Sequence, residues 1–288
     1  MKAVSRLRQL LLNGELIVAP GAFDCLTANA VEEAGFPALY MTGMGTSASR
    51  LGLPDYGLAT MSEMVANASA MAATVKIPII ADADTGYGNE LNMTRTIREY
   101  ERQGAAGVHI EDQVFPKKCG HLDQKQVIPR AEYVSKIHAA VNARINPDFV
   151  IIARTDSNGV LGFEEAVGRA NAALDVGADL ALVEAPVSIK ELEDIPQRVH
   201  GPCVLNMLLG GKSPLLSLRD VGDLGYRMVL LSDVLLTAAI SAYDAALQTV
   251  RTSAHPLHFA NTLTPGQIFR RLGAEQWDAL RTSHVDAH

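Results

Sequence analysis

The sequence predicts an α/β fold, a (β/α)8 TIM-type barrel with an N-terminal helix and a C-terminal helical extension. Short apolar, β-branched runs alternate with longer segments of helical spacing, which is the pattern of repeated βα units. Eight such units follow one another, more than the roughly five or six strands usual in an open doubly wound sheet. The runs are apolar through most of their length, as parallel strands covered on both faces should be.

The first element is a helix in residues 1–18, whose amphipathic pattern lacks the long apolar run and cleavage site of a signal peptide. The predicted strands are the runs 16–19, 38–41, 78–82, 107–111, 149–154, 180–185, 203–206 and 228–232. The predicted helices are 24–35, 61–75, 90–103, 130–145, 163–176, 188–199, 217–224 and 233–251. Gly35, Gly104 and Gly177 end three of these helices, as glycine commonly does.

We expect one domain over residues 1–288, with the barrel at about 16–251. No linker rich in Pro, Ser or Gly and no block of charge divides the chain. The tail 252–288 contains Pro256 and a short helix at 265–283. We interpret it as an appendage that packs on a neighbouring element or a partner subunit.

Composition narrows the classes of partner. The net charge of −7 argues against a nucleic-acid-binding protein, which would normally be basic. No stretch approaches the roughly 18 apolar residues that span a bilayer, so no membrane association is expected. Cys25, Cys119 and Cys203 are too few and too widely spaced for a disulfide scaffold, which favours the reduced cytoplasm. A small molecule is the expected partner.

Reactive groups should lie where the strands end, because such barrels build their active sites from the carboxyl ends of the strands. Four acids stand at these ends: Asp82, Asp84, Glu111 and Glu184. They would repel one another unless a hard cation lay among them, and Mg²⁺, bound by one or two carboxylates and water, suits such a ring. Mn²⁺ is a close second. A helix cap explains any single Asp equally well, but it does not explain four acids on one rim.

The longest predicted loop, 112–129, carries the sequence Lys-Lys-Cys-Gly-His at 117–121. It far exceeds the roughly 2 to 6 residues typical of such connections, and it has a glycine within a reactive cluster. Both features indicate a lid that closes over substrate. We expect the flanking lysines and His121 to favour the thiolate of Cys119 and to prepare it for proton transfer or nucleophilic attack. The alternative, a buried thiol that acts only as a small hydrophobe, is favoured for Cys25 and Cys203.

The segment Gly-Met-Gly-Thr-Ser-Ala at 43–48 follows a strand and matches the G-x-G-x-x-A pattern of dinucleotide-binding sites. Gly52 and Pro54 interrupt the helix that should begin there, and eight βα units disfavour a Rossmann sheet. We therefore expect the backbone N–H groups of these glycines to hold a substrate carboxylate or enolate instead.

Nearly the whole chain resembles the isocitrate lyase/phosphoenolpyruvate mutase superfamily. The matching segments are PGAFDCLTANAVEEAGFPALYMTG (20–43), LGLPD (51–55), ADADTGYGN (81–89), GVHIEDQVFPKKCGH (107–121), FVIIARTD (149–156), VEA (183–185) and NMLLGGKSP (206–214). The Lys-Lys-Cys-Gly-His element resembles the lyase and carboxyphosphonoenolpyruvate mutase branches in particular.

The resemblance implies a role for each residue of the rim and the lid. Asp84 would coordinate Mg²⁺ directly, whereas Asp82 and Glu111 would hold it largely through water. The implied substrate-binding residues are Tyr40, Thr42, Gly43, Met44, Asp55, Gly120, Glu184 and Asn206. The implied catalytic residues are the general acid Cys119, its neighbours Lys117 and His121, and the carboxylate-binding Arg154.

The implied activity is that of a carbon-carbon lyase of the 2-methylisocitrate/dimethylmalate type. Mg²⁺ would chelate the 2-hydroxy group and adjacent carboxylate, and the thiol would protonate the departing carboxylate enediolate. The alternatives are a carboxyphosphonoenolpyruvate or phosphonopyruvate-type phosphorylmutase, an oxaloacetate hydrolase and, as a different class, a non-catalytic metabolite-binding barrel. The resemblance also implies a homotetramer whose C-terminal helices exchange between subunits.

The chain departs from the family where the substrate is selected. Thr237 stands where members that act on methylisocitrate have an Arg, which argues against a tricarboxylate. Ser232 replaces a Pro and resembles members that cleave oxaloacetate to oxalate and acetate. The pair Leu208–Leu209 replaces a Glu or Thr and predicts a more apolar second half of the substrate. A dicarboxylate with alkyl substituents, similar to dimethylmalate or methylmalate, fits these differences.

Overall fold

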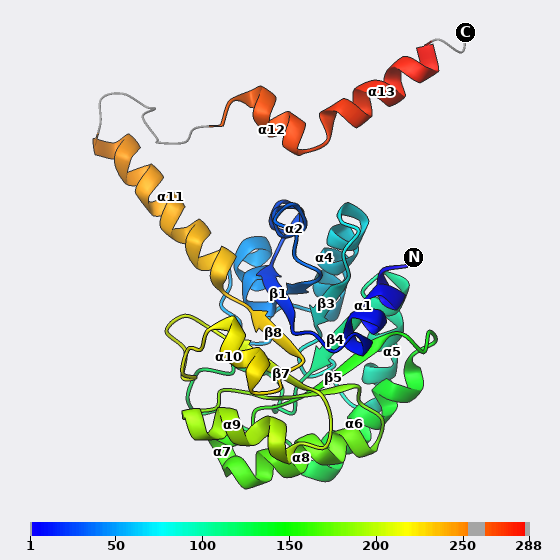
Figure 1. The fold of residues 1–288 in the computed structure, drawn as a ribbon, viewed down its shortest axis with the longest axis vertical. Coiled ribbons are helices and arrows are strands. Elements are labelled where there is room, and N and C mark those ends of the chain that lie inside the picture. The colour runs from blue at the N-terminus through cyan, green and yellow to red at the C-terminus, as the bar shows by residue number, and fades with distance from the viewer. Residues whose placement is uncertain (1, 253–262, 286–288) are drawn as a thin grey trace. The chain divides into compact units, whose positions relative to one another are not determined.

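The computed structural model describes residues 2–252 and 263–285 and contains the predicted barrel. Eight parallel strands close in the order β1 to β8 (Figure 1). The strands are β1 Ile17–Ala22, β2 Leu39–Met41, β3 Ile79–Asp82, β4 Gly107–Ile110, β5 Val150–Thr155, β6 Leu180–Val183, β7 Cys203–Met207 and β8 Met228–Leu231. Because β1 pairs with β8, the sheet has no free edge. All eight predicted strands are confirmed.

The predicted helices around the barrel are confirmed as well. They are α1 Ala3–Leu12, α2 Cys25–Glu33, α4 Met61–Thr74, α5 Glu90–Arg102, α6 Arg130–Ala143, α8 Phe163–Asp175, α9 Ile189–Arg198, α10 Leu218–Asp223 and α11 Val234–Thr252. Three short helices were not predicted: α3 Gly43–Thr46, η1 Ser47–Leu51 and α7 Asn158–Leu161. They lie in the loops after β2 and β5, where a single turn is too short to show a helical period.

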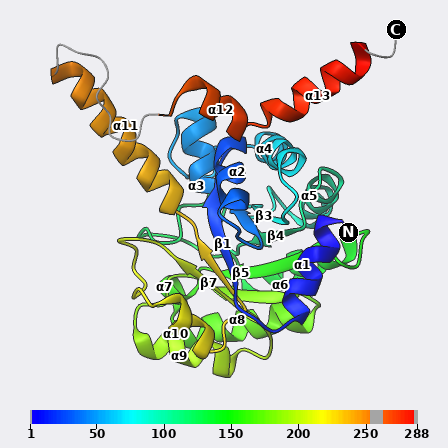
Figure 2. The same ribbon diagram turned by 45° about the horizontal axis from the view of Figure 1, so that its top comes forward.

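Apolar side chains fill the inside of the barrel. This layer includes Tyr40, Ile80, Ile152, Leu182 and Met228. Helix α1 lies beside β5 (Figure 2) and adds its Leu7 to the same layer, so it covers the amino-terminal end of the barrel. The filled interior is a core and not a channel. Polar chemistry is therefore confined to the opposite end, where the strands terminate.

The chain divides into two compact units, Met1–Ala238 and Ala239–His288. Where one helix was predicted at 265–283, there are two, α12 Pro265–Arg271 and α13 Ala274–Val285. Gly273, with φ of 81°, separates them. Residues 253–262 and 286–288 of the predicted appendage 252–288, and with them Pro256, lie outside the described residues. The single domain over 1–288 stays a prediction. No helix among the described residues is long and apolar enough to cross a membrane.

Candidate active site

One cavity lies at the carboxyl ends of the strands and brings most of the predicted site residues together. Its lining consists of Tyr40, Thr42, Gly43, Met44, Asp55, Asp82, Cys119, Gly120, His121, Arg154, Glu184, Asn206, Leu208 and Ser232. Polar side chains from several strand ends and from the predicted loop 112–129 converge in it. Three further predicted residues, Asp84, Glu111 and Lys117, are outside the lining but contact residues within it.

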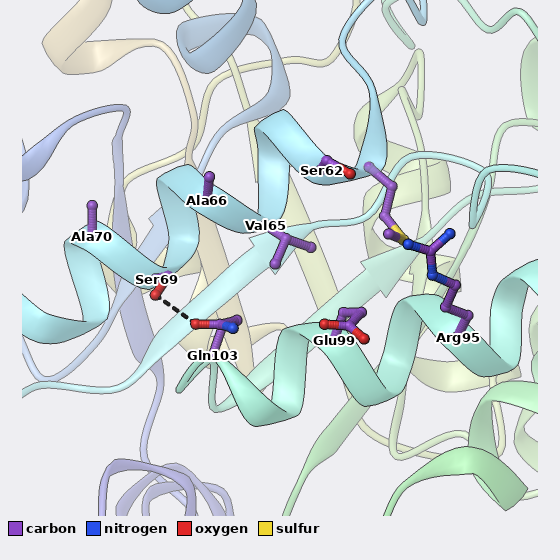
Figure 3. Close-up of a pocket in the computed structure, with 9 residues that line it drawn as sticks. Ser62, Val65, Ala66, Ser69, Ala70, Arg95, Glu99 and Gln103 are labelled. Carbon is purple, nitrogen blue, oxygen red and sulfur yellow. Dashed lines mark hydrogen bonds between the residues drawn. The ribbon is translucent and has the colours of Figure 1, made fainter.

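A larger hollow of about 550 Å³ lies on the outside of the barrel between α4 and α5 (Figure 3). Small side chains of α4, among them Ala66 and Ala70, form one side, and Arg95, Glu99 and Gln103 of α5 form the other. The Ser69 hydroxyl donates a hydrogen bond to Gln103 Oε1 across it, at 2.8 Å. Its lining has one acid, Glu99, and neither Cys nor His, whereas several acids, Cys119 and His121 line the cavity at the strand ends, which is therefore the better candidate for the chemistry.

Asp82, at the end of β3, is fixed by four neighbours. Its oxygens accept hydrogen bonds from the Tyr40 hydroxyl (3.1 Å), Gly43 N–H (3.1 Å) and Asp84 N–H (3.0 Å). His109 Nε2 lies 2.7 Å from Asp82 Oδ1. Burial acts to raise the pKa of Asp82, but His109, Lys117 and Arg154 together outweigh it and hold this pKa well below its usual range. Asp82 is therefore a preorganised carboxylate.

His109 is a site residue that the sequence analysis missed. It lies in β4, is fully buried, and contacts both Asp82 and the Tyr40 hydroxyl, whose oxygen is 3.0 Å away. A histidine inside an otherwise apolar strand was the available signal. Its position shows that the polar network of the site extends one residue deeper into the barrel than the strand ends.

The expected role of the Gly43 and Gly45 N–H groups is wrong. Gly43 N–H donates to Asp82, and Gly45 N–H donates to Thr42 Oγ1 at 2.9 Å, where Thr42 caps α3. Both donors are therefore occupied within the protein. Gly43 lies so close to Asp82 that an added Cβ would meet the carboxylate, which explains the glycine. The helix α3 has only four residues and the sheet is a closed barrel, whereas the dinucleotide-binding pattern needs a long helix after a strand of an open sheet. The dinucleotide-binding interpretation is therefore excluded.

Lys117 points at two acids and not at Cys119. Its Nζ lies 2.6 Å from Asp55 Oδ1 and 2.9 Å from Asp84 Oδ1. Burial raises the pKa of Asp84 to about 6, and the Lys117 ammonium opposes the rise without cancelling it. Burial likewise raises the pKa of Glu111 well above its ordinary value. Neither Glu111 oxygen has a hydrogen-bond partner among the described residues.

These acids fit a magnesium ion. Glu111 Oε1 is a buried carboxylate oxygen without a hydrogen-bond partner or ion pair among the described residues, which is costly unless a cation or water completes its surroundings. No three His, Cys, Asp or Glu side chains in the described part of the chain converge closely enough to enclose a metal alone. Mg²⁺ keeps several waters and takes only one or two carboxylates directly, so this donor set suits it better than zinc.

Arg154, at the end of β5, is a buried cation surrounded by acids. Its Nε donates to Asp156 Oδ2 at 2.8 Å, and its Nη2 lies 3.3 Å from Glu111 Oε2. Burial acts to lower the pKa of Arg154, but Asp156, Glu111 and Glu184 raise it well above its usual value. The guanidinium thus stays charged inside the cavity and is oriented by Asp156, a geometry suited to binding a substrate carboxylate.

The predicted lid is a loop closed at its base. Gln113 and Val127 form an antiparallel bridge, and Val114 N–H donates to Gln126 O at 2.9 Å. The Gln113 side chain then holds the loop from inside, because its amide donates to Lys118 O at 2.7 Å and accepts from Lys118 N–H at 3.0 Å. This contact fixes the backbone between Lys117 and Cys119, which sends the lysine to the acids and leaves the thiol in the cavity lining.

The expectation that the lysines and His121 favour the thiolate of Cys119 is wrong. Burial raises the pKa of Cys119, and the His121 N–H and Arg154 only partly oppose it. Lys117 is neutralised by its own acids, so its charge does little for the sulfur. Cys119 is therefore a protonated thiol at neutral pH, which is the form a proton donor requires.

The far side of the cavity is a hydrogen-bonded row of three side chains, with His121 next to its last member. Ser232 donates to Asn206 Oδ1, and Asn206 Nδ2 donates to Glu184 Oε1 at 3.0 Å. His121 Nε2 lies 3.1 Å from the same Glu184 oxygen. Burial acts to raise the pKa of Glu184, but Arg154 and His121 outweigh it and hold the pKa far below its usual range. The lid thus reaches the barrel through His121.

The three positions expected to select the substrate lie in different surroundings. Ser232 and Leu208 line the cavity. Leu209 is 59% exposed and is not part of the lining, so only one leucine of the pair adds apolar surface. The Thr237 hydroxyl donates to the carbonyl of Asp233 within its own helix, at 2.9 Å.

Comparisons with known proteins agree with this geometry. A family model described as phosphoenolpyruvate phosphomutase matches residues 7–251. A 2,3-dimethylmalate lyase of Eubacterium barkeri is 46% identical over 230 residues, 80% of each chain. A solved oxaloacetate acetylhydrolase in complex with 3,3-difluorooxalacetate has a TM-score of 0.94 and 39% identity, covering 99% of this chain and 97% of that one.

A solved phosphonopyruvate hydrolase in complex with oxalate and Mg²⁺ has a TM-score of 0.90 and 31% identity, covering 99% of this chain and all of that one. The family match spans the whole barrel and includes every residue of the site described above. This chain is a member of the phosphoenolpyruvate phosphomutase family, within the isocitrate lyase/phosphoenolpyruvate mutase superfamily of barrel enzymes.

Proposed function

We propose that this chain is a carbon-carbon lyase that cleaves a small 2-hydroxy dicarboxylic acid into a 2-keto acid and a second carboxylic acid. The observation that carries the proposal is Cys119, because the lid places its thiol in the same cavity as Arg154 and the acidic rim. Similarity to a 2,3-dimethylmalate lyase supports a substrate with alkyl groups. Leu208 in the lining gives such groups an apolar neighbour.

Each half of the substrate has its own set of side chains. Arg154 pairs with a carboxylate, and Asn206 and Glu184 meet the polar groups of the departing half. As the bond between the hydroxyl-bearing carbon and its neighbour breaks, the electron pair moves onto the neighbouring carbon and into its carboxylate as an enediolate, and the Cys119 S–H gives that carbon a proton. The hydroxyl proton passes to a carboxylate of the acidic rim and returns to the Cys119 sulfur as the products leave, so the reaction consumes no net proton. The closed lid keeps bulk water from protonating the enediolate first.

Asp84, Asp82 and Glu111 are the residues that would hold a divalent cation, Mg²⁺ or alternatively Mn²⁺. When bound, the cation lowers the pKa of the substrate hydroxyl group and polarises its neighbour carboxylate. The charges around the cavity support this proposal. The carboxyl groups are Asp55, Asp82, Asp84, Glu111, Asp156 and Glu184, and the paired cations are Lys117, Lys125 and Arg154. A doubly charged substrate needs additional positive charge to enter such surroundings.

A panel of substrates tests the proposal. The purified protein with Mg²⁺ is mixed separately with 2,3-dimethylmalate, 2-methylmalate, 2-methylisocitrate, oxaloacetate and phosphonopyruvate, and products are followed by proton and phosphorus NMR. We expect a 2-keto acid from an alkyl-substituted 2-hydroxy diacid, loss of activity in excess chelator, and recovery with added Mg²⁺. A folded protein that turns over none of the hydroxy diacids would contradict the proposal, and a new phosphate-ester resonance from phosphonopyruvate would favour a mutase.

Ser232 favours oxaloacetate hydrolysis as a second candidate function. Its hydroxyl lines the cavity and donates to Asn206 Oδ1, so a polar group stands beside the departing half of the substrate. The likeness to an oxaloacetate acetylhydrolase supports the same interpretation. The panel separates the two functions, because this activity releases oxalate and acetate from oxaloacetate and leaves the hydroxy diacids unchanged.

A homotetramer with exchanged C-terminal helices is proposed for the assembly. Ile240, Tyr243, Leu247 and Val250 of α11 recur every three or four residues and are exposed, so they form one apolar face. Such a face is stabilised when a second copy covers it. Leu247→Asp should therefore dissociate the assembly in sedimentation equilibrium, whereas Ala245→Glu on the opposite face should not. A wild-type monomer would contradict the proposal.

A further inference from the structure

Lys125 is a buried cation that the proposed reaction does not use. It belongs to the lid, and only 8% of the residue is exposed. Its ammonium donates to the carbonyl of Gly120 and to Asp156 Oδ1, the latter at 2.9 Å. An ammonium group is expensive to bury unless it is paired, so the lid gains from placing it there only when both partners are in position.

The two partners of Lys125 belong to different parts of the site. Gly120 is the lid residue next to Cys119, and an added Cβ there would lie 2.6 Å from Glu184 Cγ and against the Arg154 guanidinium. Asp156 Oδ1, which accepts from Lys125, also accepts from Arg154 Nη2 at 3.1 Å. The contacts therefore form a ring from Gly120 through Lys125, Asp156 and Arg154 back to Gly120.

We propose that Lys125 is a positioning residue that couples closure of the lid to the orientation of Arg154. The inference rests on the proposed function, in which Arg154 binds the substrate carboxylate. When the lid closes, the ammonium reaches Asp156 and holds the Gly120 carbonyl, so the lid tip is fixed on the guanidinium and Cys119 is fixed in the cavity. When the lid opens, Asp156 keeps Arg154 charged and buried, but Gly120 no longer limits its position.

A second lysine contact on the lid gives a matched control. Lys212 Nζ forms an ion pair with Asp123, but 37% of the lysine side chain and 86% of the aspartate side chain are exposed. Exposed pairs of this kind contribute little, because water competes for both charges. Lys212→Met removes this side-chain contact and keeps the backbone N–H that donates to His121 Nδ1.

The experiment measures how fast iodoacetamide modifies Cys119, by mass spectrometry of its peptide, with and without oxalate and Mg²⁺. Cys25, which lies on α2 away from the lid, is the internal reference for reagent and time. Oxalate should protect Cys119 in the wild-type protein. In Lys125→Met the protected rate should rise roughly tenfold to a hundredfold, which is what one hydrogen bond to a charged group is worth, and Lys212→Met should change it little.

The modification assay tests this inference independently of the proposed function, because it needs no substrate. Turnover is then measured as a second readout. With the best substrate of the panel, Lys125→Met should lower kcat more than it raises KM, since the lid must hold Cys119 and Arg154 together during the reaction. A protected rate in Lys125→Met equal to that of the wild-type protein would overturn the inference even if the enzyme is an active lyase. If Lys125→Met unfolds, Lys125→Gln, which keeps one donor, is measured in the same way and with the same criterion.

Discussion

The floor of the cavity and its lid hold their functional groups in different ways. Asp82, Arg154 and Glu184 stand at or next to strand ends, where the closed barrel fixes their backbones. The lid has no apolar core of its own, and Phe115 and Leu122 are exposed. It is held by polar contacts such as those of Gln113 and Lys125. The floor is thus part of the barrel's stability, whereas opening the lid breaks its hydrogen bonds and the buried ion pairs of Lys117 and Lys125 and leaves the barrel core in place.

The largest expected effect is on kcat when Cys119 of the lid is replaced, while ligand binding by the floor stays nearly unchanged. Cys119→Ser replaces the thiol with a hydroxyl of much higher pKa at nearly the same size, so kcat should fall by about 10² to 10⁴. Oxalate binding with Mg²⁺, measured by calorimetry, should stay within a few-fold of the wild-type value because the floor is unchanged. A variant with full activity would remove the thiol from the mechanism.

A change in the floor should lower binding and turnover together. Asp84→Asn removes one carboxylate charge where we propose the cation binds. Asp84 has φ of 47°, a left-handed conformation that Asn adopts more readily than most residues, so the backbone is not strained. Because Lys117 still has Asp55 as a partner, we expect a folded protein. Calorimetry should show Mg²⁺ affinity reduced by about tenfold or more, the effect of losing a charge-assisted interaction. An unchanged Mg²⁺ affinity would mean that the cation does not bind at Asp84.

More of the cavity floor than of the lid could be predicted from the sequence. The strands could be predicted from local patterns, and their last residues place Asp82, Arg154 and Glu184 without any tertiary information. His109 was missed because its role depends on Tyr40 and Asp82 from two other strands. Lys125 was missed because its partners Gly120 and Asp156 are brought to it only by the folded loop.

The error over Cys119 has the same origin. Neighbours in sequence predict a thiolate, but the charge of Lys117 is directed to Asp84 and Asp55, and burial then decides the protonation state. The functions of Gly43 and Gly45 were wrong for a similar reason, since their donors are used by Asp82 and Thr42. Local patterns identify which groups are present, and only packing determines which of them remain available.

A smaller effect on kcat/KM should come from a substitution in the loop after β7, which packs against His121 of the lid. Gly211 packs against His121, and an added Cβ would lie 2.7 Å from its Nδ1. Its φ is not in the left-handed region, so Gly211→Ala should push the imidazole without straining the backbone. We expect kcat/KM to fall by about tenfold, the size of one lost hydrogen bond to a charged group. Gly266→Ala, where an added Cβ would meet nothing within 4 Å, is the control.

The smallest expected effect is a shift of the Cys119 titration midpoint to higher pH. Burial raises the pKa of Cys119, so the thiol holds its proton to a higher pH in the folded protein than in the unfolded chain. Since only the thiolate reacts with iodoacetamide, the rate for Cys119 should rise with pH at a midpoint above that of the same peptide in urea-unfolded protein. A midpoint at or below the unfolded value would mean that the cations of the lid prevail over burial. Cys119 would then act as a thiolate, and the lid would have to deliver a base or a nucleophile instead of a proton.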